Sequence, residues 1–218
     1  LTWNDWPVSS QDYDLFITNT SGTVLASSER LQNGTQPPTE NIFFTAPTSG
    51  TFQIRVKPLS VSSPKELAIF NLNQDITPAV ASGSIVSPAD SANALAVGAV
   101  RYSQWTTGPI EVFSSQGPTT DGRSKPDIVG PDSVSVSTSQ FNPFNGTSAA
   151  APHVAGAAAL LLSENPGLTA STLQSKLRSD AIPMGSSNQF GSGRLNLTSQ
   201  PTGRPDLTIF DPNFTPAN

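Results

Sequence analysis

One serine of this chain stands where a long apolar run begins. Ser148 follows Asn145-Gly146-Thr147, and residues 149–162 consist of alanine, leucine, valine and glycine apart from Pro152 and His153. Such a run lacks the polar face of a surface helix, so it predicts a helix that is buried on all sides. Free backbone N–H groups and the helix dipole at its start would stabilise an oxyanion that develops beside the serine hydroxyl. The pattern therefore suits Ser148 to nucleophilic attack on a carbonyl group.

The same residues also allow a structural interpretation. Thr147 and Ser148 carry side-chain oxygens of the kind that cap helix starts. Pro152 falls in or near the first turn, where a missing backbone donor does least harm. Ser148 is thus either a nucleophile or only a helix cap, and the surrounding sequence favours the nucleophile.

That surrounding sequence carries a family resemblance. Residues 146–156 read Gly-Thr-Ser-Ala-Ala-Ala-Pro-His-Val-Ala-Gly, which closely resembles the nucleophile signature of subtilisin-like serine peptidases. The resemblance covers about residues 80–198 and departs at Gly130-Pro131-Asp132, where relatives usually carry Ala-Pro-Gly. It implies a serine endopeptidase that hydrolyses protein or peptide substrates through an acyl-enzyme. Further segments agree with the family in order and spacing: residues 88–100, 113–118, 121–128 and 191–196.

The resemblance also assigns roles to single residues. It implies that Ser148 is the nucleophile and that its own backbone N–H forms half of the oxyanion hole. Thr147, Pro152 and His153 match structural positions near the site. The implied chemistry requires no cofactor.

The chain contains a single histidine, His153, five residues after Ser148. That spacing rotates it by about 140° around the helix axis, so its ring cannot easily reach the serine hydroxyl. In the family, the catalytic aspartate and histidine and the oxyanion asparagine all precede the serine by a long stretch. We therefore expect the N-terminal half of the catalytic domain to be missing from these residues, to be the partner of this chain, and to be needed for activity. The alternative is a noncatalytic binding or scaffold protein that retains the fold.

Residues 76–200 alternate between buried strands and helices. Residues 95–100 form an apolar run of strand length, typical of a parallel sheet that is covered on both faces. The helix after Ser148 should end at Asn165-Pro166-Gly167, and Thr169 should cap a second, amphipathic helix. Together with the resemblance, this pattern predicts an α/β fold, the C-terminal part of a doubly wound, mostly parallel subtilisin-like sheet.

Two aspartates lie near the strand end that precedes the nucleophile loop. Neither Asp127 nor Asp132 stands at the position of the family's catalytic aspartate. We expect both to be fixed loop carboxylates.

Residues 1–75 differ in character from the rest. Short β-prone runs separated by turn residues predict a small antiparallel β-sandwich, and the segment resembles jelly-roll modules of secreted bacterial peptidases. The expected strands cover residues 15–17, 23–26, 41–45, 51–56 and 66–70. Residues 201–218 should form a linker and the first strand of a downstream immunoglobulin-like module.

Acidic and aromatic residues near the N-terminus suggest two binding sites. Asp12 and Asp14 are two residues apart in an expected strand, so both carboxylates should point to one face, where Asp5 could join them. This predicts a structural calcium site, although a solvated polar face is the alternative, because calcium requires six to eight oxygen ligands. Trp3 and Trp6 could form a sugar-binding platform or pack at the edge of the sheet.

The composition narrows the class of protein. A formal charge of −5 and the absence of any long basic run argue against nucleic-acid binding. The chain has no cysteine, which excludes disulfides and thiol redox chemistry, and no apolar run reaches membrane-spanning length. Charged residues make up only 12% of the chain. This polar but weakly charged composition indicates a secreted, extracellular protein.

Overall fold

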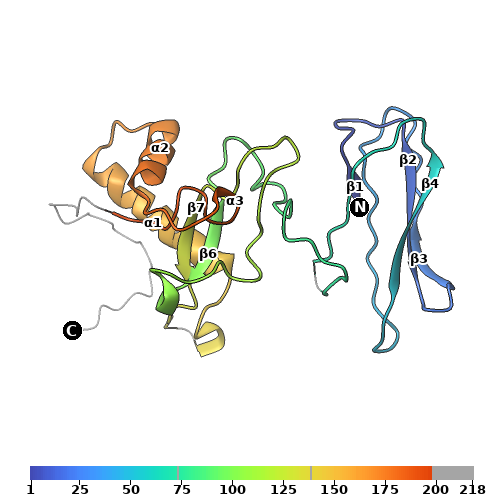
Figure 1. Cartoon of the computed structure of the whole chain (residues 1–218), viewed down its shortest axis with the longest axis horizontal. Helices are drawn as coiled ribbons and strands as arrows, with labels where there is room; N and C mark the ends of the chain where they lie inside the picture. The colour runs from blue at the N-terminus through green and yellow to red at the C-terminus, as the bar shows by residue number, and fades with distance from the viewer. Residues whose placement is uncertain (73, 138, 198–218) are drawn as a thin grey trace, which may run out of the picture. The chain divides into compact units, whose positions relative to one another are not determined.

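The computed structural model describes residues 1–72, 74–137 and 139–197 (Figure 1). The chain divides into two compact units, Leu1–Ala79 and Val80–Asn218. The segment predicted to start an immunoglobulin-like module, residues 201–218, lies outside the described residues. None of the helices in the described ranges is long and apolar enough to cross a membrane.

The N-terminal unit contains two small antiparallel sheets. In the larger sheet, β2 (Asp12–Thr18) lies between β3 (Val24–Ser28) and β4 (Gln53–Ser60). In the smaller one, β1 (Thr2–Trp3) pairs with β5 (Leu67–Ala68). The turn that the sequence predicts after β2 is present, since the N–H of Asn19 donates to the carbonyl of Thr23 at 3.0 Å.

One of the expected strands is absent from this unit. Residues 41–45 have no strand structure, and the side chain of Phe43 is fully exposed. Phe44 nevertheless contacts Phe52 edge-on, with ring centroids 5.4 Å apart. The segment thus lies beside the start of β4 through a ring contact instead of a backbone ladder, and the described residues show two small sheets, not the full sandwich that we expected.

The C-terminal unit is built on a parallel pair of strands, β6 (Val97–Arg101) and β7 (Ile128–Asp132). Ala99, Val100, Ile128 and Val129 are all fully buried, as expected for strands covered on both faces. The sequence is right about the α/β class. The described sheet is smaller than a doubly wound sheet, because beyond the β6–β7 pair only isolated bridges extend it, from Val129 to Arg194 and from Arg194 to Ile182.

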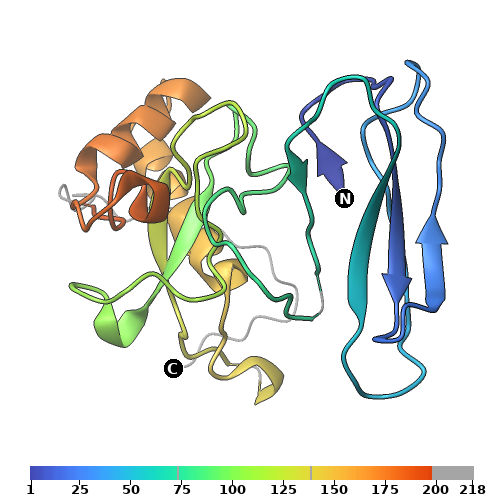
Figure 2. The same ribbon diagram turned by 45° about the vertical axis from the view of Figure 1, so that its right-hand side comes forward.

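Helix α1 (Thr147–Glu164) packs across both strands and runs behind them in Figure 2. Its buried residues share one face and are Ala149, Ala150, Val154, Ala157 and Leu161. Ala151, Ala155 and Gly156 on the other side are exposed. The prediction of a helix buried on all sides is therefore wrong for the described residues, because only one face of α1 meets the sheet and the neighbouring helix.

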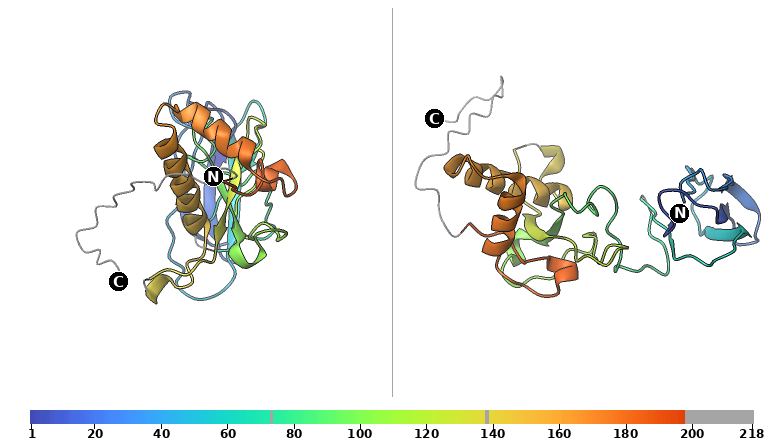
Figure 3. Two further views of the ribbon diagram at one scale, coloured as in Figure 1. Left: turned by 90° about the vertical axis from the view of Figure 1, so that its left-hand side faces the viewer. Right: turned by 90° about the horizontal axis from the view of Figure 1, so that it is seen from above.

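That neighbour is α2 (Ala170–Asp180), which lies beside α1 in both views of Figure 3. As predicted, α1 ends at Glu164 and Thr169 caps α2, with its side chain accepting from the N–H of Thr172. Leu177 joins Ile128, Val154, Ala157 and Leu161 in the core, and Leu173 packs against them. On the opposite face of the sheet, Phe190 of α3 (Ser187–Phe190) packs against Val100 and Val129.

A buried ion pair fixes the segment that enters β7. The Lys125 ammonium lies 2.5 Å from the Asp127 carboxylate, and both side chains are almost fully buried. Lys125 also donates to the carbonyl of Ala94 at 2.7 Å, and Asp127 accepts from the N–H of Ala96 at 2.7 Å. Arg178 of α2 approaches Asp127 at 3.4 Å. Asp127 thus ties the starts of both strands and α2 together, which supports its prediction as a fixed carboxylate.

Gly193 bonds to β7 through its carbonyl, at a position that only glycine tolerates. Its φ is +122°, and a Cβ there would lie 2.0 Å from the carbonyl oxygen of Ile182. We expect Gly193→Ala to lower the free energy of unfolding by about 2 kcal/mol or more, because the new methyl group adds a clash to backbone strain. Chemical denaturation of the full-length protein measures this loss. Gly167→Ala is the matched control, since no atom lies within 4 Å of its added Cβ; equal stability of the two variants would contradict the prediction.

We further expect Lys125→Met to cost about 3 kcal/mol of unfolding free energy, because Asp127 would stay buried without its ammonium partner. The control is Lys176→Met, which removes the more exposed pair with Asp180 on α2. Such surface pairs contribute about 0.5 kcal/mol. Denaturation midpoints of the two variants compare the pairs directly, and a Lys125→Met midpoint as close to wild type as the control's would refute a stabilising role of the buried pair.

Candidate active site

The nucleophile candidate lies in the first turn of α1. The helix begins at Thr147, so Ser148 is its second residue, and Gly146 is the N-cap with φ of +118°. No side chain caps this helix start. The sequence-based expectation that Thr147 and Ser148 cap the helix is therefore wrong, because the chain enters the helix through a glycine conformation that leaves both residues inside the first turn.

This arrangement leaves the groups of Ser148 free. Its side chain is exposed, and its hydroxyl has no hydrogen-bond partner among the described residues. The N–H groups of Ala149 and Ala150 both donate to the carbonyl of Gly146, at 2.9 and 3.3 Å. Within the described ranges, the N–H groups of Thr147 and Ser148 have no such acceptor. A hydroxyl and a backbone donor are thus available side by side at the positive end of the helix dipole.

His153 is bound to its own helix and not to the serine. Its ring Nδ1 lies 2.7 Å from the carbonyl oxygen of Ala149, and the side chain is exposed. Because a carbonyl only accepts, this contact requires the proton on Nδ1. Pro152 is the sixth residue of the helix, just beyond the first turn, where it lacks the N–H that would bond to the carbonyl of Ser148.

The carboxylate of Asp132 is bonded to Gly146, the N-cap of α1. Asp132, the last residue of β7, is fully buried, and its Oδ2 accepts from the N–H of Gly146 at 3.1 Å. Val134 and Phe144 exchange backbone hydrogen bonds of 3.2 and 2.8 Å and close the loop between β7 and α1. The structure therefore holds Asp132 as a loop carboxylate beside the nucleophile segment.

The structure places Asp12 and Asp14 in the interior, not on a solvated face. Their exposed fractions are 1% and 3%. A register shift between Asp12 and Tyr13 interrupts the pairing with β4, so simple alternation does not hold at Asp12. Burial raises the pKa of Asp14, helped by the negative charges of Asp12 and Glu29 and opposed by Lys57.

Asp12 has different neighbours from those that the sequence suggested. Its Oδ1 accepts from the N–H of Gln32 at 3.3 Å, and the Gln32 amide donates to Glu40 at 2.8 Å. Glu40 is fully buried and also accepts from Ser28 and from the N–H of Arg30. Sequence reasoning missed Gln32 and Glu40 because they come from an irregular segment with no periodic signal.

The acidic side chains bear on the calcium site that the sequence predicts at Asp12 and Asp14. In the described part of the chain, no group of three or more histidine, cysteine, aspartate or glutamate side chains is placed to hold a metal ion. Calcium takes six to eight oxygen ligands, which include backbone carbonyls and water, so the site at Asp12 and Asp14 stays a prediction.

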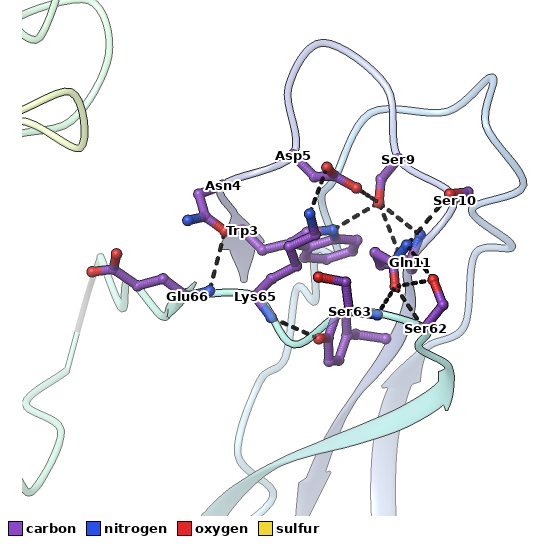
Figure 4. Close-up of polar contacts among 11 residues, drawn as sticks. Trp3, Asn4, Asp5, Ser9, Ser10, Gln11, Ser62, Ser63, Lys65 and Glu66 are labelled. Atoms are coloured by element: carbon purple, nitrogen blue, oxygen red, sulfur yellow. Dashed lines mark hydrogen bonds and ion pairs between the residues drawn. The ribbon is translucent and has the colours of Figure 1, made fainter.

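Asp5 and Trp3 belong to a separate polar network (Figure 4). Asp5 pairs with Lys65 at 3.0 Å and accepts from Ser9 at 2.7 Å, and these contacts lower its pKa. It therefore does not join Asp12 and Asp14. Trp3 is buried, donates to Ser9 at 3.0 Å and packs edge-on against Tyr13, whereas Trp6 is exposed, so the two do not form one binding platform.

Comparison with known proteins finds relatives of this chain, and the family match lies mostly in the C-terminal unit. The sequence model of the Subtilase family matches residues 71–193. Subtilisin Savinase of Lederbergia lenta is 40% identical over 117 residues, which are 52% of this chain and 40% of that protein. Subtilisin BL of the same organism is 35% identical over 164 residues, 68% of this chain and 56% of that protein. Alkaline protease of Shouchella clausii is 40% identical over 117 residues, 28% of its length.

The chain thus spans about half or less of the length of these relatives. Residues 1–70 lie outside the family match, so the jelly-roll resemblance of the N-terminal unit stays a prediction. The match itself covers the strands β6 and β7, the buried ion pair and the loop that carries Ser148, and it includes more than half of the 218 residues. The chain therefore belongs to the subtilase family.

Proposed function

We propose that this chain is part of a serine endopeptidase in which Ser148 attacks the carbonyl carbon of a peptide bond. The proposal rests on the Ser148 hydroxyl and its own N–H at the start of α1, both without a partner among the described residues, in a chain of the subtilase family. Attack forms a tetrahedral intermediate whose oxyanion accepts a hydrogen bond from this N–H. Collapse expels the amine and leaves an acyl-enzyme, which water then hydrolyses.

The reaction needs a base that takes the serine proton. His153 is unsuitable, because its Nδ1 is bound to the carbonyl of Ala149 and its position in the helix directs it away from Ser148. The catalytic histidine and aspartate therefore come from a part of the enzyme outside these 218 residues. In our proposal the isolated chain does not hydrolyse peptides, and its partner in catalysis is that other part of the domain.

The proposed substrates are proteins or peptides, in keeping with the alkaline protease and subtilisins that the chain resembles. We also propose that the protein acts outside the cell. Support for this comes from the polar but weakly charged composition, in which only 12% of the residues are charged. No cofactor takes part in the proposed chemistry.

Replacement of the nucleophile tests the proposal. We expect Ser148→Ala in the full-length protein to lower kcat for casein or a peptide substrate by about a millionfold, the loss known for subtilisin itself. An active-site-directed phosphonate should label wild-type protein at Ser148 and should not label the isolated chain. Ser163→Ala, an exposed serine of the same helix, is the control and should retain wild-type activity.

Full activity in Ser148→Ala would show that the nucleophile is another residue. Absence of both hydrolysis and labelling in wild-type full-length protein would instead favour a noncatalytic scaffold that retains the fold.

The buried carboxylate of Asp14 gives a pH prediction that also tests calcium. Because the pKa of Asp14 is raised in the folded state, the folded protein binds this proton more tightly, and stability falls as pH rises through the raised pKa. We expect Asp14→Asn to raise Tm at pH 7 in EDTA, and this gain to vanish near pH 3. Asp75→Asn, at an exposed site, is the control.

Calcium adds a second comparison in the same experiment. A structural calcium ion at Asp12 and Asp14 would raise the Tm of the wild type more than that of Asp14→Asn. An equal effect of calcium on both proteins would show that the calcium prediction is wrong, and a lower Tm of Asp14→Asn at pH 7 in EDTA would contradict the electrostatic argument.

A further inference from the structure

Asp132 is buried to an unusual degree for a carboxylate in a loop. It is 0% exposed, and its Oδ2 accepts from the N–H of Gly146 at 3.1 Å and from the Ser133 hydroxyl at 3.4 Å. Its Oδ1 is buried and has no partner among the described residues. Burial of a carboxylate with one oxygen unpaired is unfavourable, so this side chain is not in place simply to stabilise the fold.

The residue that Asp132 holds decides where the nucleophile lies. Gly146 is the N-cap of α1 and precedes Ser148 by two residues. The Ser148 side chain has no contact of its own that fixes it, because it is exposed and its hydroxyl is unpaired within the described ranges. Its position therefore depends on the backbone of residues 146–148, and the bond to Asp132 is a side-chain restraint on that backbone.

The backbone on the other side of this contact is strained. Ser133 follows Asp132 with φ of +59°, the sole positive φ of a non-glycine residue in the described chain. Such conformations persist where surrounding contacts impose them, and they concentrate at functional sites. The turn at Ser133 directs the chain into the loop that Val134 and Phe144 close, while the Asp132 side chain stays under the helix start.

We propose that Asp132 is a positioning residue for the nucleophile, which it places by holding the N–H of Gly146. This inference rests on the proposed function of Ser148. The contact makes the role specific to the Asp132 side chain, because no other side chain among the described residues accepts from the N–H of Gly146.

The test uses the full-length protein with Asp132→Ala, Asp132→Asn and the control Asp121→Ala, which removes an exposed carboxylate from the residue 119–123 turn. Phosphonate titration counts the reactive serines, so that kcat is expressed per active site. We expect Asp132→Ala to lower kcat per active site by about tenfold to a hundredfold with KM changed less than about threefold, as for a displaced catalytic group. Asp132→Asn should stay within about threefold of wild type, since its amide oxygen still accepts from Gly146.

Hydrogen exchange gives a readout that does not depend on activity. The amide of Gly146 should exchange faster in Asp132→Ala than in wild type, because it loses its acceptor, while Asp132→Asn and Asp121→Ala should match wild type. A purely structural role would lower the number of titratable serines and leave kcat per active site unchanged, and that result would overturn the proposal. Unchanged exchange in Asp132→Ala would overturn it as well, whereas a wild-type protein that the phosphonate does not label would refute the proposed function itself.

Discussion

Helix α1 packs directly on the backbone of strand β7, and the arrangement of the C-terminal unit follows from that contact. Gly130 makes it possible, because a Cβ at this position would lie 2.5 Å from the carbonyl oxygen of Ala150. The close approach brings Val154, Ala157 and Leu161 onto Ile128, and α2 adds Leu177 to the same core. Since β7 ends at Asp132 and α1 begins at Thr147, the packing also sets how the intervening loop must run.

Buried charged side chains hold both ends of strand β7. Lys125 and Asp127 are buried together at the entry to β7, and Asp132 is buried at its exit. The first carboxylate has cationic partners and a backbone donor, whereas the second relies on a backbone N–H and a hydroxyl. The strand is thus held at one end by an ion pair and at the other by weaker, neutral donors. This difference leaves the end next to Ser148 as the more easily altered of the two.

Local signals in the sequence predicted a good part of this unit. The apolar run at residues 95–100, the end of α1 before Asn165 and the Thr169 cap all follow from side-chain patterns that act within a few residues. The motif around Ser148 led to the family, which the comparisons confirm. The role of Ser148 itself and the structural roles of Thr147, Pro152 and His153 remain predictions.

What the sequence did not predict depends on contacts between distant residues. Asp12 bonds to the N–H of Gln32, whose amide bonds to Glu40, and no pattern near Asp12 predicts these residues of an irregular segment. The exposed face of α1 was unexpected because an apolar sequence indicates what a helix could bury, not what is available to cover it. The absence of a strand at residues 41–45 has the same origin, since a β-prone run forms a ladder only where a partner strand lies alongside.

Because the N-cap of α1 is a glycine, no capping side chain competes with an oxyanion for the N–H of Ser148. A capping side chain at position 146 would accept from the N–H of the second or third helical residue, and the second residue is Ser148. Serine or aspartate at this position would occupy the very group that an oxyanion must reach, and as a helix cap it would gain only on the order of a few tenths of a kcal/mol over glycine. Gly146 leaves this donor vacant. The helix start thus gives up little stability through its glycine, and an incoming carbonyl oxygen has no capping side chain to displace.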